Sequence, residues 1–94
     1  MNAPLQTSHR ESHVAYDRVV VMLNDNWRLI VCKDGIQWIL QRRVGERAGG
    51  ARFDSRQYLT TKEGVMRACR TFAGAMTPQA AVALNFLPKH IGGA

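Results

Sequence analysis

The most regular alternation of apolar and polar residues lies in residues 27–43, WRLIVCKDGIQWILQRR. Here Asp34-Gly35 separates two runs that are rich in β-branched and aromatic residues. This dipeptide is typical of a two-residue type I′ turn, in which both central residues have positive φ. The pattern therefore predicts a β-hairpin in one register. Its expected pairs are Val31 with Trp38, Ile30 with Ile39, Leu29 with Leu40, Arg28 with Gln41 and Trp27 with Arg42.

This register divides the side chains of the hairpin between two faces, because successive residues of a strand point in opposite directions. One face is apolar and is predicted to lie in the core, with Lys33 and Arg42 at its margins; it holds Trp27, Leu29, Val31, Ile36, Trp38 and Leu40. The second face holds Arg28, Ile30, Cys32, Gln37, Ile39, Gln41 and Arg43. It is interpreted either as a solvated sheet surface or as a surface that contacts a ligand.

Two further segments have the composition of strands. Residues 18–23 (RVVVML) are followed by three turn-favouring residues, so a first strand is predicted to pair with residues 27–33. Residues 44–50 contain three glycines and predict a mobile connection to a strand over residues 51–59. In that strand Phe53 and Leu59 are expected to point inward, unless a bulge reverses part of it.

The C-terminal third predicts two helices. Thr60 and Glu63 have the spacing of a capping box, and an apolar stripe at helical spacing follows as far as Gly74. This stripe is expected to cover the face that holds Trp27 and Trp38. Thr77-Pro78 predicts a second helix start, and residues 80–87 are apolar on nearly all sides. That helix must bury itself on the first helix and the sheet, or against a second subunit in a homodimer.

Together these segments predict the α+β class. The expected fold is a three- or four-stranded antiparallel meander followed by two C-terminal helices packed on one sheet face. Residues 1–13 are polar and are interpreted as a flexible N-terminal tail, because they offer little apolar surface to bury. Residues 14–91 are predicted to form a single domain, and residues 92–94 a loose C-terminus.

The sequence offers little catalytic or metal-binding chemistry. His9 and His13 are four residues apart, but a zinc site needs three or four converging ligands. No phosphate-binding glycine motif or nucleophile context occurs, so no enzyme activity, metal or cofactor is expected. Cys32 and Cys69 are interpreted as reduced cysteines. With no signal peptide or spanning segment evident, a cytoplasmic protein without a membrane partner is predicted.

The distribution of charge favours a polyanionic partner. The net charge is +6, and residues 27–70 contain ten basic and four acidic residues. Positive charge on a folded region favours encounter with nucleic acid, an acidic protein surface or an anionic membrane. The alternative is a solvated surface that is simply rich in arginine.

Two hypotheses follow for the second sheet face. In the first, a β-ribbon binds nucleic acid, because arginine and glutamine pair with base edges and phosphates. Its candidate residues are Arg28, Gln41, Arg43, Arg52 and Arg56. In the second, the same face is a protein-binding module with arginines at its rim. Its apolar anchors are then Ile30, Ile39 and Tyr58.

Two resemblances bear on these hypotheses. A three-stranded sheet followed by a helix with a T-x-x-E start resembles the AP2-type and integrase arm-type DNA-binding modules over residues 27–74, and this implies a sheet face placed on the DNA groove. The stretch W-R-x-I-x-C-x-D-G-I-Q-W-I-L-Q-R-R resembles the core of small uncharacterised bacterial proteins. That likeness implies an accessory protein of a mobile element, a setting in which small domains also inhibit host proteins.

Overall fold

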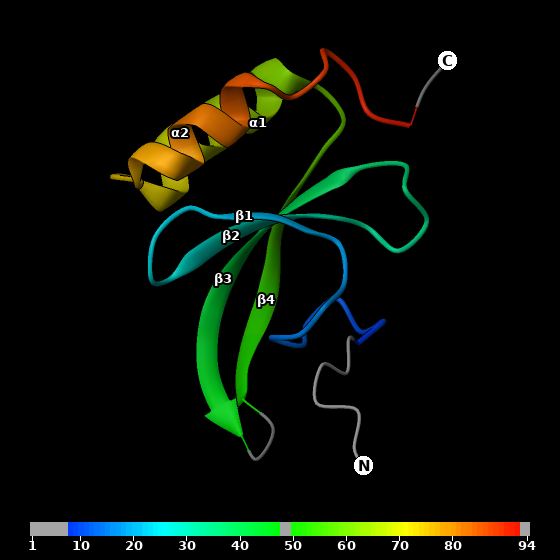
Figure 1. Ribbon diagram of the computed structural model, residues 1–94, viewed down its shortest axis with the longest axis vertical. Helices are drawn as coiled ribbons and strands as arrows, with labels where there is room; N and C mark the ends of the chain where they lie inside the picture. The colour runs from blue at the N-terminus through cyan, green and yellow to red at the C-terminus, as the bar shows by residue number, and fades with distance from the viewer. Residues whose placement is uncertain (1–7, 48–49, 93–94) are drawn as a thin grey trace.

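The chain forms one antiparallel sheet followed by helices (Figure 1). The computed structural model describes residues 8–47 and 50–92. Its strands lie in the order β1-β2-β3-β4, and this α+β arrangement confirms the predicted fold class. The elements are β1 (Val19–Met22), β2 (Trp27–Val31), β3 (Trp38–Arg47), β4 (Gly50–Leu59), α1 (Lys62–Ala68), the π-helix η1 (Cys69–Ala73) and α2 (Pro78–Asn85).

The predicted register of the β2–β3 hairpin is confirmed at all five pairs, from Trp27 with Arg42 to Val31 with Trp38. The predicted turn is wrong. Gly35 has a φ of 74°, but no non-glycine residue in the described part of the chain has positive φ, so the Asp34 backbone does not fit a type I′ turn. Instead the Gly35 amide donates to the Cys32 carbonyl oxygen at 2.9 Å, and the loop spans four residues.

Helices α1, η1 and α2 cover the predicted core face, which we call the helix-side face. Leu29, Trp38 and Leu40 on this face form one buried cluster with Val65, Cys69 and Leu84. The predicted helical stripe therefore packs where expected. The helical segment ends at Gly74, whose φ of 73° is a conformation that glycine adopts without strain.

The starts of the two helices were predicted with different success. Thr61, not Thr60, caps α1: its Oγ1 accepts a hydrogen bond from the Gly64 amide at 2.9 Å. Thr77 caps α2 as predicted, because its Oγ1 accepts from the Ala80 amide at 3.1 Å.

Strands β3 and β4 form a long two-stranded ribbon that extends away from the helices (Figure 1). The predicted mobile connection is wrong for residues 44–47, which belong to β3, and for Gly50, which begins β4; residues 48–49 lie outside the described part. The pairing shifts between Leu40 and Gln41 and again between Arg43 and Gly45. The expectation that Phe53 and Leu59 share one side is wrong. The first irregularity leaves Leu59 on the helix side and Phe53 on the opposite side, as in the alternative of a bulge.

The N-terminal segment differs most from expectation. Residues 8–16, which we call the strap, lie against the sheet face opposite the helices (blue in Figure 1). Tyr16 packs there against Ile30, Cys32 and Ile39 in a second buried cluster. The predicted flexible tail therefore does not describe residues 8–13, because the sheet supplies the partners that the segment lacks by itself. Residues 1–7 lie outside the described part.

Candidate functional site

The eight predicted interface residues separate into two groups. Four are in the interior: the exposed fractions are 1% for Arg28, 0% for Gln41, 0% for Ile30 and 1% for Ile39. The other four reach the surface: Arg43, Arg56 and Tyr58 are exposed, and Arg52 is half-buried. The expected open sheet face is therefore wrong at its centre, because the strap covers it.

The Arg28 side chain forms hydrogen bonds with groups in the interior of the protein. Its guanidinium donates to the carbonyl oxygens of Glu11 at 2.8 Å, His13 at 2.9 Å and Val14 at 3.3 Å, and to Gln41 Oε1 at 2.8 Å. It also lies 3.8 Å from the centre of the Phe53 ring. Burial lowers the pKa of Arg28 to about 10. The Arg28 side chain therefore binds the strap and is not accessible to a ligand.

Two other polar side chains on the covered face, those of Gln41 and Tyr16, also form hydrogen bonds inside the protein. Gln41 Nε2 donates to the Glu11 carbonyl oxygen at 2.9 Å and to Ser55 Oγ at 3.2 Å. The Tyr16 hydroxyl donates to the Val31 carbonyl oxygen at 2.7 Å. Burial, assisted by the nearby charge of Glu11, raises the pKa of Tyr16. The face therefore acts as a second core and fixes the strap in place.

A different arginine surface lies on the helix-side face, beyond the part that the helices cover. Cross-strand partners share a face. The row that joins Trp27, Arg42 and Asp54 follows the row of the buried Leu29 and Leu40 and the half-buried Gln57. The next row toward the ribbon tip pairs Gly45 with Arg52. We call the surface formed by Arg42, Arg52 and Asp54, together with Arg56, which is ion-paired to Asp54, the ribbon face.

Positive charge exceeds negative charge on the ribbon face. Arg56 Nη1 lies 3.1 Å from Asp54 Oδ2. None of the ion pairs found among residues 8–47 and 50–92 involves Arg42 or Arg52. Arg43 belongs to the opposite side of the ribbon, where its Nη2 lies 3.5 Å from Glu46 Oε1. The ribbon face thus offers two arginines that are not paired with a carboxylate within the described chain.

Aromatic side chains mark the inner end of the ribbon face. Phe72 is 44% exposed, and its ring centroid lies 6.3 Å from that of the half-buried Trp27. Gln57, Arg67 and Phe72 line a shallow cavity of about 200 Å³ beside β4. An aromatic edge next to arginines and a glutamine is able to contact bases as well as phosphates.

Sequence reasoning missed Arg42, which it placed at the margin of the core face. The observed lengths of the elements explain the difference, and the sequence analysis did not predict the length of β3 because it assigned residues 44–50 to a connection. A strand of 10 residues spans roughly 33 Å, whereas the 12 residues of α1 and η1 span about 18 Å. The helices therefore cannot cover the whole ribbon, and side chains near its tip remain on the surface.

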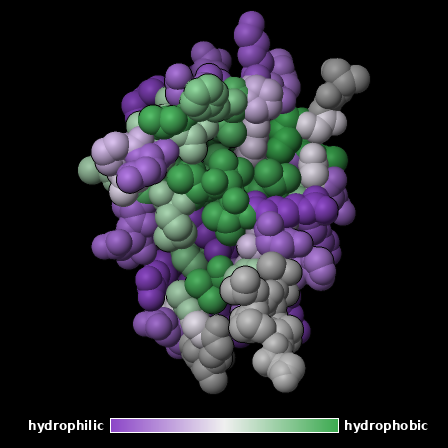
Figure 2. All heavy atoms as spheres, viewed as in Figure 1, coloured by the Kyte–Doolittle hydropathy of each residue, from purple (hydrophilic) through white to green (hydrophobic). Residues whose placement is uncertain are grey.

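A second group of exposed apolar side chains lies away from the ribbon face. Figure 2 shows apolar residues across the region of β1 and α2, with hydrophilic residues around it. Val82 on α2 is 57% exposed, Phe86 at the C-cap of α2 is 81% exposed, and Met22 on β1 is 41% exposed. Helix α2 carries no charged residue, so this surface has no feature that selects a polyanion.

Other chemistry is sparse in the part of the chain that the structure describes. It contains no group of three or more histidine, cysteine or acidic residues placed to hold a metal ion. Burial raises the pKa of the Cys69 thiol to about 11, which keeps the thiol protonated near neutral pH. No helix within the described residues is both long and apolar enough to cross a membrane. In comparisons with known proteins, no family model, no curated protein and no solved structure matches the chain.

Proposed function

We propose that this protein binds nucleic acid, and that it does so through the ribbon face. The observation that carries the proposal is the placement of Arg42 and Arg52 on one side of a ribbon that extends beyond the helices, with Arg56 ion-paired to Asp54 on that side. The binding surface is therefore not the face expected from the sequence, since Arg28 and Gln41 are buried.

The shape of the ribbon favours duplex DNA. A two-stranded β-ribbon fits the major groove, where arginine pairs with guanine edges or with the flanking phosphates. In this arrangement Arg42 and Arg52 contact phosphates or base edges. Asp54 orients Arg56, and Phe72 at the inner end contacts a sugar or base.

Protein binding through the sheet face opposite the helices, the alternative expected from the sequence, is less favoured. Two of its three expected anchors, Ile30 and Ile39, lie in the interior, and only Tyr58 of that set remains exposed. The nucleic-acid hypothesis keeps Arg52 and Arg56 at the ribbon face and gains Arg42, while Arg43 is exposed on the opposite side of the ribbon.

Fluorescence polarisation with a labelled mixed-sequence duplex tests the proposal. We expect binding at about 50 mM salt that weakens steeply by about 200 mM, because each phosphate contact releases counterions. Arg42→Ala and Arg52→Ala should each weaken binding and reduce the salt slope by about one. Arg18→Ala removes the same charge next to the opposite edge strand and serves as the matched control. No binding at low salt, or an equal loss with Arg18→Ala, would overturn the proposal.

A further inference from the structure

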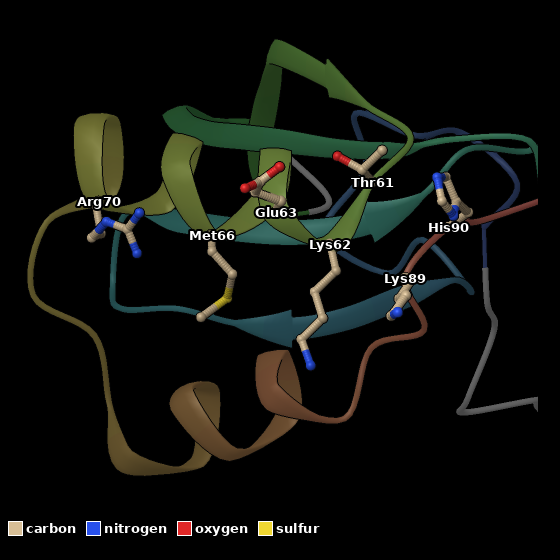
Figure 3. A pocket seen from close by; sticks show the side chains of 7 residues that line it. All are labelled: Thr61, Lys62, Glu63, Met66, Arg70, Lys89 and His90. Atoms are coloured by element: carbon tan, nitrogen blue, oxygen red, sulfur yellow. The ribbon is translucent and has the colours of Figure 1, made fainter.

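A groove lies on the other side of α1, away from the ribbon face (Figure 3). It has a volume of about 530 Å³, and residues of α1 and η1 form one wall while the chain after α2 forms the other. The lining residues used below are Lys62, Glu63, Met66, Arg70, Lys89 and His90. We call this feature the helix groove.

The two walls of the helix groove are tied together by backbone hydrogen bonds. The Lys62 amide donates to the Lys89 carbonyl oxygen at 2.9 Å, and the Ile91 amide donates to the Thr60 carbonyl oxygen at 3.1 Å. Thr61 and His90 form an isolated antiparallel bridge between these bonds. The groove is therefore preformed, so a ligand does not need to order its walls.

The charges around the groove are mainly positive. Lys62, Arg70 and Lys89 line it together with one carboxylate, that of Glu63. Lys62 Nζ donates to the Asn85 carbonyl oxygen at 2.6 Å, and an ammonium group has two further donors. Arg70 and Lys89 are exposed, and neither takes part in an ion pair found within the described residues.

The floor of the groove is apolar. Lys62, Met66 and Arg70 recur at intervals of four residues, which places them in a row along one side of the helical segment. Met66 is half-buried against the helix-side core and stands between the two cations (Figure 3). Its flexible thioether adapts to the shape of a neighbouring side chain, and the lysine and arginine stems add apolar surface.

We propose that the helix groove binds an acidic peptide segment of a partner protein. An apolar side chain of that segment packs on Met66, and its carboxylates contact Arg70, Lys62 and Lys89. A nucleic-acid backbone fits this site less well, because Glu63 interrupts the row of cations and the floor offers apolar contact in place of hydrogen-bond partners.

The two binding surfaces can be separated by mutation of one helix. Arg67 lines the cavity beside Phe72, on the side of α1 that leads to the ribbon face, whereas Arg70 lines the helix groove. Both arginines are exposed, so replacing either with glutamate changes the same charge at the same depth. Comparing ligand affinity in Arg67→Glu and Arg70→Glu therefore shows on which side of α1 the ligand binds.

The test uses a fluorescein-labelled peptide of alternating aspartate and glutamate with one central phenylalanine, and a second peptide with serine in its place. We expect the phenylalanine peptide to bind the 94-residue chain, and Arg70→Glu and Lys89→Glu each to weaken binding about tenfold or more. The serine peptide should bind severalfold more weakly, and Arg67→Glu should leave peptide affinity unchanged. Circular dichroism melts check that each variant folds.

Three results would overturn the proposal. The first is no binding of the phenylalanine peptide to the wild-type protein, and the second is an equal loss with Arg67→Glu. The third is that Arg70→Glu weakens the binding of a labelled thymidine oligonucleotide more than it weakens the binding of the peptide. That result would assign the groove to nucleic acid. The ribbon-face proposal is judged separately by Arg42→Ala and Arg52→Ala, since neither residue lines the helix groove.

Discussion

At the residue scale, Arg28 explains why the second sheet face is closed. A buried guanidinium is costly unless its donors are satisfied, and here neutral acceptors satisfy it: three backbone carbonyl oxygens of the strap and the amide oxygen of Gln41. The face of Phe53 provides a further favourable contact for the cation. One arginine thereby links the strap to both β2 and β3.

Replacing Arg28 with methionine should destabilise the protein by about 2–4 kcal/mol, because the strap carbonyls and Gln41 lose their donors in a buried place. Urea denaturation measures the change in the free energy of unfolding. Arg43→Met is the matched control: Arg43 is exposed on the same side of the sheet, and its replacement should change stability by about 0.5 kcal/mol or less. Equal effects of the two substitutions would contradict the role assigned to Arg28.

Cys69 gives a prediction about alkaline pH. Its folded-state pKa of about 11 lies above its ordinary value of 9.0, so the folded state holds the proton more tightly than the unfolded state. The resulting stability is fully present below pH 9 and is lost as pH rises toward 11. Thermal melts from pH 8 to 11 should therefore fall less steeply in Cys69→Ala than in the wild-type protein. Parallel pH curves would show that Cys69 burial does not couple folding to protonation.

At the element scale, the start of α1 shows how far a sequence motif can specify a helix boundary. Thr60 and Thr61 are adjacent, and either has a polar residue or glycine three positions later. The capping-box spacing favours Thr60 with Glu63, yet the Thr61 hydroxyl accepts the hydrogen bond. Tertiary contacts decide between them, because the Thr60 carbonyl oxygen is engaged by the Ile91 amide and the Lys62 amide by Lys89.

Thr61→Ala should therefore lower the free energy of unfolding by about 1 kcal/mol, the usual cost of losing a helix cap. Thr60→Ala, one residue earlier, should cost about 0.5 kcal/mol or less, because the Thr60 side chain is exposed and makes none of the hydrogen bonds found in the described chain. Chemical denaturation of the two variants in parallel measures the difference. A larger loss for Thr60→Ala would restore the sequence-based assignment.

The strap is the element that sequence reasoning could not predict. The register of β2 and β3 was predictable because alternation and turn residues agree on one pairing. The same alternation says which residues share a face but not what covers that face. The strap has few large apolar residues and is held by its backbone carbonyl oxygens, which have no sequence signature. The candidate residues Arg28 and Gln41 were therefore placed on the correct face but at the wrong depth.

At the scale of the whole molecule, the sheet separates two cores. The helix side contains Leu29, Trp38 and Leu40, and the strap side contains Ile30 and Ile39. Both sides of β2 and β3 are buried near their middle. The outer half of the β3–β4 ribbon extends past the helices, whereas the strap still pairs with β4 there and Ala51 and Phe53 stay buried. This layout explains why the exposed arginines are found toward the ribbon tip and not at the centre of the sheet.

Neighbouring residues of β3 test the two-core arrangement. Ile39 and Leu40 point to opposite faces and are 1% and 0% exposed, so Ile39→Ala and Leu40→Ala should each cost about 2–5 kcal/mol. Ile36→Ala, at a position that is 58% exposed in the adjoining loop, should cost much less. Urea unfolding followed by tryptophan fluorescence measures all three. If the strap did not cover the second face, Ile39→Ala would resemble Ile36→Ala, and Arg28 and Gln41 would again be available as ligand contacts.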